Sequence, residues 1–162
     1  MFEKRANEAR ESLSRRLDVF PGSRRREKDK VEPPWIAEAE RELGYRLPDS
    51  YVWWLKEFGA LRLYGSEVYT LAPPEYRELA SDDLLYNHRL NLEDDWRPEG
   101  RLYLFVPDTD EEFFFDVSEP VREPDAPAEY PVMRFDHLGG DAEVYADDFA
   151  GFLDRILTEN NA

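Results

Sequence analysis

The side chains that most often carry enzyme chemistry are sparse in this sequence. Cysteine is absent, and the two histidines, His88 and His137, lie far apart along the chain. Such a pair lacks the ligand spacing of a zinc site. None of the seven serines lies in the Gly-x-Ser-x-Gly turn that presents a nucleophile, and the glycines form no phosphate-binding loop. We therefore expect no cofactor and no metal, and we expect both histidines in loops or at the surface.

Carboxylates are abundant, and one segment is similar to part of a calcium-binding loop. Asp108, Asp110 and Glu112 alternate along the chain, and Glu119 stands at the twelfth position of the pattern. Phe113 occupies the sixth position, where the sharp turn of an EF-hand requires glycine, so we interpret the segment as a turn between strands. Paired carboxylates could also serve a hydrolase, which would need a sugar-sized cleft and acids with different pKa values. We rank that function last.

Charge is the more informative property. The chain holds 21 basic and 37 acidic residues, a net charge of −16. Residues 1–34 contain 10 basic and 7 acidic residues (net +3), so the remainder contains 11 basic and 30 acidic residues (net −19). This surface should repel nucleic acids and anionic membranes and attract a basic protein. The sequence shows neither a signal peptide nor a membrane-spanning segment, so we expect a cytoplasmic protein.

The acids gather in expected loops and turns, often beside tryptophan. Loops on a rigid scaffold commonly hold binding residues, and tryptophan is a frequent interface anchor. The candidate partner-binding residues are Asp82, Asp83, Glu93, Asp94, Asp95, Trp96, Asp108, Asp110, Glu111, Glu112 and Trp53. Asp141 and Glu143 form a further acidic pair. The alternative interpretation is that the acids serve solubility alone and that both tryptophans complete the core.

The elements that would carry these loops follow from the periodicity. Apolar residues of the first segment repeat at a helical spacing, so residues 1–32 are predicted to form an amphipathic helix and a charged, weakly structured linker. Pro33 opens a second helix that ends at Gly44, and Asp49 is expected to cap a third that ends at Gly59. The expected buried face of the third helix consists of Tyr51, Trp54, Leu55 and Phe58.

Strand-forming residues dominate the second half of the chain. Short strands are expected at residues 61–64, 67–71, 102–106, 113–117, 131–135 and 143–145, with irregular structure and one short helix between 75 and 96. An apolar stripe from Phe149 to Leu157 predicts a final helix, which Asp147 or Asp148 would cap. The expected fold class is therefore α+β.

One stretch resembles a family signature. It reads Glu40-x-x-Leu43-Gly44-x-x-Leu47-Pro48-x-x-Tyr51-x-x-x-Leu55-x-x-Phe58-Gly59 and resembles the opening of the SUKH superfamily, which includes bacterial immunity proteins and yeast cell-wall synthesis regulators. The segments 67–71, 115–117 and 146–153 follow in the family's order, so the resemblance covers roughly residues 33–157. Ala60, where the family often has glycine, and residues 75–100 depart from the pattern.

The resemblance implies a domain over residues 33–162, with a central, mostly antiparallel β-sheet, helices packed mainly on one side, and an extra N-terminal helix. It also implies an immunity protein that binds and blocks a cognate toxin, often a basic nuclease, without catalysis of its own. Such a protein would be a monomer or a weak homodimer. A regulatory or scaffolding module is the alternative that the yeast relatives suggest, since fold alone does not fix function.

Overall fold

The computed structural model describes residues 2–160, leaving out the side chain of Phe2. In chain order its elements are α1 (Phe2–Val19), β1 (Ser23–Arg24), η1 (Glu27–Asp29), α2 (Pro33–Leu43), α3 (Asp49–Glu57), β2 (Ala60–Leu63), β3 (Ser66–Glu67), η2 (Pro74–Leu79), α4 (Leu84–Leu92), β4 (Arg101–Phe105), β5 (Glu111–Asp116), β6 (Val132–Asp136), β7 (Asp141–Ala146) and α5 (Phe149–Glu159). One sheet has the order β1-β2-β3 and the other β4-β5-β6-β7, with antiparallel neighbours throughout. The predicted α+β fold is confirmed.

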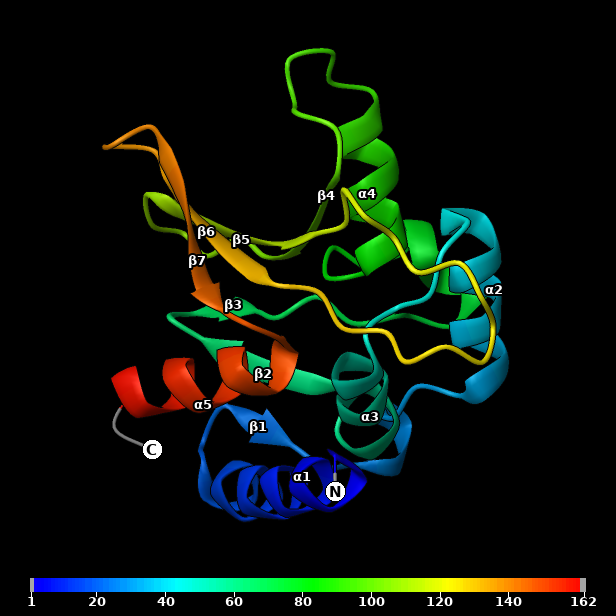
Figure 1. Cartoon of the computed structure of the whole chain (residues 1–162), viewed down its shortest axis with the longest axis vertical. Coiled ribbons are helices and arrows are strands. Elements are labelled where there is room, and N and C mark those ends of the chain that lie inside the picture. Colours follow the sequence, from blue (N-terminus) through cyan, green and yellow to red (C-terminus); the bar gives the residue numbers. More distant parts are fainter. Residues whose placement is uncertain (1, 161–162) are drawn as a thin grey trace.

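Helices cover one side of the four-stranded sheet (Figure 1). Helix α1 lies at the base of the molecule, α5 lies between α1 and the sheet, and α3 lies beside α5. Helix α4 stands near β4, and the β6–β7 hairpin extends away from the helical layer on the other side. Between these two arms no helix lies over the sheet in the part of the chain that the structure describes. We call this surface the open face.

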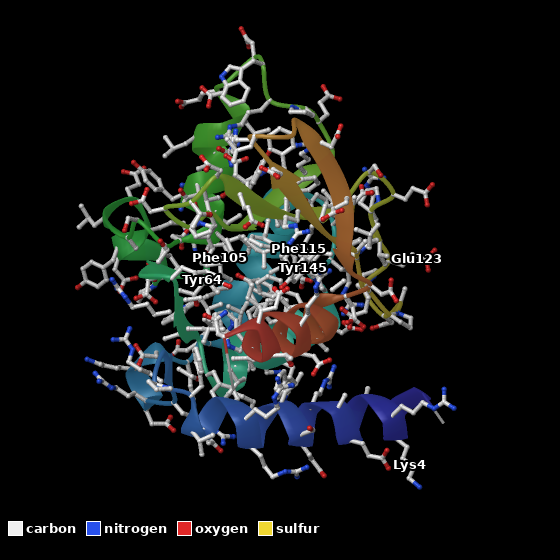
Figure 2. The ribbon with its side chains drawn as sticks, turned by 90° about the vertical axis from the view of Figure 1, so that its left-hand side faces the viewer. Lys4, Tyr64, Phe105, Phe115, Glu123 and Tyr145 are labelled. Atoms are coloured by element: carbon white, nitrogen blue, oxygen red, sulfur yellow. The ribbon has the colours of Figure 1, made fainter. Side chains whose placement is uncertain are left out.

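Aromatic side chains fill the space between the sheet and the helices. Phe113 and Phe115 are separated by one residue of β5, so they point to the same side of the sheet. The ring centroids of Phe113 and Phe152 lie 5.6 Å apart, which joins β5 to α5. Figure 2 shows Phe115 together with Phe105 and Tyr145 at the centre of the molecule. This aromatic cluster is the core that sets the position of the sheet.

The helical hairpin of α2 and α3 follows the prediction except at one cap. The predicted buried face of α3 is confirmed, since its four residues are fully shielded from solvent. Gly44 ends α2 with φ at 82°, a conformation that favours a residue without Cβ. The predicted cap of α3 is wrong, because Pro48 occupies that position. The Asp49 carboxylate instead pairs with Arg46 at 2.8 Å and accepts a hydrogen bond from the Ala128 N–H at 3.1 Å.

The linker after α1 is more ordered than predicted. Its residues 23–24 form β1, which pairs with β2. The Gly22 oxygen accepts a hydrogen bond from the Arg62 N–H at 2.7 Å, and a Cβ at Gly22 would lie 2.0 Å from the Arg62 oxygen. This close approach requires glycine. Helix α1 buries Leu13 and Leu17 in the common core, while the domain boundary proposed at residue 32 stays a prediction.

The second half of the chain matches its predicted elements. Helix α4 is the short helix expected between residues 75 and 96, and η2 precedes it. Asp148 caps α5, because its carboxylate accepts a hydrogen bond from the Gly151 N–H at 2.7 Å. The strand predicted at 67–71 is shorter than expected, since β3 ends at Glu67.

Replacing Leu55 by alanine should lower the free energy of unfolding by about 2–5 kcal/mol, because the change leaves a cavity in the fully buried face of α3. Urea denaturation followed by circular dichroism measures this loss. The control is the exposed neighbour Lys56, whose change to alanine should alter stability by less than about 0.5 kcal/mol. A Leu55→Ala variant as stable as the control would contradict the packing described.

Candidate functional site

The acidic turn between β4 and β5 lies beside the tip of the β6–β7 hairpin. Strand pairing places Glu111 opposite Asp136, and the Asp110 backbone oxygen accepts a hydrogen bond from the His137 N–H at 2.8 Å. The two turns border an open hollow of about 550 Å³. Carboxylates from the two turns and from the strands that flank them line this hollow, namely Asp110, Glu111, Asp136, Asp141 and Glu143. Together with Asp108, we call these residues the acidic tip.

Negative charge exceeds positive charge at the acidic tip. Arg134 forms ion pairs with Glu111, at 3.4 Å, and with Glu143. The hydrogen bond to Glu143 raises the pKa of the Arg134 guanidinium, so this group stays charged. Asp110 and Asp141 are exposed and form no ion pair with any residue that the structure describes. Their charges remain available to a basic partner.

A second acidic segment, residues 93–96, follows α4, and we call it the acidic loop. Glu93, Asp94 and Asp95 are exposed, and the Trp96 side chain is 70 % exposed. The Arg97 guanidinium carbon lies 4.8 Å from the centroid of the Trp96 ring. Cation–π contact of this kind orients the ring without covering it. The acidic loop and the β6–β7 hairpin stand on either side of the open face in Figure 1.

Glu112 connects these two acidic segments and is not an accessible acid. Its side chain is buried, with His137 Nε2 at 3.2 Å from Oε1 and Arg97 Nη1 at 3.7 Å from Oε2. The sequence analysis placed Glu112 among the partner-binding acids. That prediction needs correction, because the carboxylate is enclosed between a guanidinium and an imidazole of its own chain. Its contacts instead fix the acidic loop and the hairpin relative to each other.

Basic and aromatic side chains cover the open face next to Glu112. The Arg97 guanidinium lies 4.9 Å from the centroid of Tyr103, and the Arg101 guanidinium lies 4.3 Å from that of Phe114. Sequence reasoning missed this surface. Strand alternation was the available signal, since Phe114 must point to the opposite side from its two phenylalanine neighbours.

Asp83 is an internal residue, which corrects its prediction as a binding residue. It is fully buried, and its carboxylate accepts hydrogen bonds from the Tyr86 N–H at 2.7 Å and the Ala72 N–H at 2.8 Å. It also pairs with the buried Arg77 at 3.2 Å. The neighbouring Asp82 is half-buried, which raises the pKa of its carboxyl, and it lies at the opposite end of α4 from the acidic loop.

Trp53 lies on the α1 side of the molecule. Its ring is half-buried and lies 6.0 Å from Phe58, and the Arg10 guanidinium of α1 lies 6.0 Å from the ring centroid. Helix α3 is near the base of the molecule in Figure 1, away from both acidic segments. This placement fits the alternative interpretation of Trp53 as a residue that completes the core.

Family comparison agrees with the signature found in the sequence. The SMI1-KNR4 cell-wall family, SUKH_6, matches residues 34–153. The chain belongs to the SUKH superfamily. The match begins in α2 and ends in α5, so this SUKH domain includes both acidic segments and the open face, while α1 and its linker lie outside. No curated protein sequence matched the chain.

Metal ligands and membrane-spanning helices bear on what the SUKH domain can bind. Among the residues described, no group of three or more histidine, cysteine, aspartate or glutamate side chains is placed to hold a metal ion. Within residues 2–160, no helix combines the length and apolar character needed to cross a membrane. The arrangement offers hydrogen-bond acceptors and aromatic rings, which are groups suited to contact with basic side chains.

Replacing Asp83 by alanine should lower the free energy of unfolding by about 3–5 kcal/mol, because it removes a partner of the buried Arg77. The matched control is Asp82→Asn. The pKa of Asp82 is higher in the folded than in the unfolded chain, so its charge opposes folding above the unfolded value, and removing that charge should leave stability at pH 7 unchanged or higher. Urea denaturation compares the two, and equal losses at both positions would contradict these roles.

Proposed function

We propose that this SUKH protein is a non-enzymatic immunity protein that binds and neutralises a cognate bacterial toxin in the cytoplasm, with a basic nuclease-type domain as the target. The observation that supports this proposal is the presence of exposed carboxylates on both sides of the open face, where the guanidinium groups of Arg97 and Arg101 lie over the buried rings of Tyr103 and Phe114. Arg97 and His137 contact Glu112 between the acidic tip and the acidic loop, which makes the two segments parts of one surface. The SUKH superfamily includes bacterial immunity proteins, which agrees with this function.

Electrostatics favour a basic target. Residues 35–162 hold 11 basic and 30 acidic residues, a net charge of −19. A nuclease must bind phosphates, so its active surface carries positive charge. Carboxylates at the acidic tip would accelerate encounter with that surface and compete there with nucleic acid. The same charge disfavours direct contact of the immunity protein with nucleic acid or an anionic membrane.

Trp96 provides the apolar anchor that such an interface needs. Tryptophan and arginine are enriched among residues whose truncation weakens protein complexes most. Trp96 is largely exposed, and its ring is oriented by Arg97, which also contacts Tyr103. Little ordering entropy would therefore be lost when a partner covers the ring. The proposed protein is a monomer or weak homodimer until it meets its target.

A regulatory or scaffolding module is the second candidate function. Helix α1 and its linker favour it, because they lie outside the matched family range and residues 1–34 carry a net charge of +3. A module of this kind would recruit a cellular protein through α1. The two functions predict partner binding through different surfaces, the acidic tip or α1, which charge-reversing variants of each surface can distinguish.

Changing Asp108, Asp110 and Glu111 to lysine should weaken binding of the proposed cognate toxin domain by about tenfold or more, mainly through slower association. Surface plasmon resonance with the purified toxin domain measures both rate constants, and growth of cells that co-express the toxin measures neutralisation. Thermal stability should be largely retained, because Asp108 and Asp110 are exposed and Glu111 loses only a partly exposed ion pair with Arg134. Glu112 is left unchanged because of its internal contacts.

The control makes the same charge change on α1, where Glu3, Glu8 and Glu11 are exposed. Lysine at these positions should leave toxin affinity within about twofold of the original, since α1 lies on the other side of the core. Equal weakening by both variants would contradict the proposed surface. Weakening by the α1 variant alone would place the toxin contact on α1 and contradict the role of the acidic tip.

A further inference from the structure

A groove beside β4 differs in charge from the rest of this acidic domain. It measures about 680 Å³ and lies between the end of α2, the second half of α4, the start of β4 and residues 117–122. Its basic and aromatic lining includes Tyr45, His88, Arg97, Arg101, Tyr103 and Arg122. Three arginines therefore meet at one groove in a domain where acids outnumber bases by 30 to 11.

Two of these arginines have no carboxylate partner. Most basic residues after residue 34 form ion pairs, whereas Arg101 and Arg122 form none with the residues that the structure describes. The Arg101 guanidinium lies over Phe114 and donates a hydrogen bond to the Tyr103 hydroxyl at 3.4 Å. Stacking holds this guanidinium in place while its charge stays unneutralised.

Residues of the same groove also carry polar atoms without hydrogen-bond partners. Tyr45 Oη, His88 Nδ1 and Arg97 Nε are shielded from solvent and have no hydrogen-bond partner within the described chain. Asp94 Oδ2 lies 3.5 Å from Arg97 Nε but does not form a hydrogen bond with it. Burial raises the pKa of Tyr45 to about 12, so its hydroxyl keeps its proton at neutral pH. Buried polar groups in folded proteins are nearly always paired, with protein groups or with ordered water.

We propose that this groove binds a carboxylate on an extended peptide segment of the partner protein. Arg101 and Arg122 supply the positive charge and the hydrogen-bond donors for the carboxylate oxygens. The inference rests on the proposed function and extends it. The acidic tip would contact basic groups of the partner, and the groove would contact an acidic group of the same partner. The partner would carry basic groups around its rim and an acidic segment that enters the groove.

Acids at the mouth of the groove narrow the choice of ligand. Asp94, Asp95 and Glu99 line the same groove and are exposed. These acids would repel a polyanion such as a nucleic acid. A peptide that combines a carboxylate with a neighbouring lysine would pair the carboxylate with the arginines of the groove and the lysine with these acids. The site therefore favours a peptide over a nucleic acid.

Two synthetic hexapeptides test the inference without any toxin. One has the sequence Leu-Glu-Leu-Glu-Leu-Lys, acetylated and amidated at its ends, and the other has glutamine at both glutamate positions. Titration of the isotope-labelled full chain, followed by NMR through backbone amides and the Arg97 Nε–H, should show about tenfold tighter binding of the glutamate peptide. General electrostatics act in the opposite direction, because the chain carries −16, so this preference must come from the groove.

Three variants make the result specific to the groove. Changing Arg101 and Arg122 to glutamine should remove the preference for glutamate, while lysine at both positions should restore most of it. The matched control changes Arg5 and Arg15, exposed on α1, to glutamine and should keep the tenfold preference. Thermal melting checks that each variant is folded. Any unfolded variant is replaced by the Arg122→Gln single change, because the Arg122 side chain is exposed and forms no hydrogen bond or ion pair with the described residues.

Equal binding of the two peptides, shifts outside the groove, or no binding at the solubility limit would overturn the inference. Because the titration contains no toxin, such a failure would leave the test of the acidic tip standing. Conversely, a clear glutamate preference combined with unaltered toxin affinity in the lysine variant of the tip would retain the groove and reject the acidic tip as the toxin-binding surface.

Discussion

Packing of aromatic rings between the four-stranded sheet and α5 is the constraint on which the rest of this structure depends. Phe113 and Phe115 must both face α5 to bury their rings, and the ring of Phe149 lies 6.2 Å from that of Phe115. A strand alternates its side chains, so Glu112 and Phe114 must face the other way. The core therefore decides which residues the sheet presents on its open face.

That open face gathers the charges that matter for binding. The acidic tip and the acidic loop lie in turns and in the strands beside them, while the guanidinium groups of Arg97 and Arg101 lie over rings of the sheet. Cations at the centre and carboxylates at the rim form a pattern that a uniformly acidic surface would not have. Such a pattern can select a partner by the positions of the charges on its surface as well as by its net charge.

Much of the fold could be predicted, because the structure that short sequence patterns favour is also the structure that packs in the core. The α3 stripe, the glycine that ends α2 and the Asp148 cap each follow from a few neighbouring residues. The two internal acids could not be recognised, because Asp83 and Glu112 are paired with arginines that only tertiary structure brings near. The groove was missed for the same reason, since its lining comes from three separate segments, within residues 43–45, 88–103 and 117–122. The exposed acids of the tip and loop could be predicted as surface residues, because the sequence pattern indicates where turns lie.

The most direct test of this account is the salt dependence of association with the proposed cognate toxin domain. Stopped-flow fluorescence, with Trp96 as an intrinsic reporter, follows the association rate constant across a range of sodium chloride concentrations. If exposed carboxylates steer the encounter, the rate constant should fall steeply as salt rises, while the dissociation rate changes little. An association rate constant that does not vary with salt would contradict the central claim that charge on these turns exists to meet a basic protein.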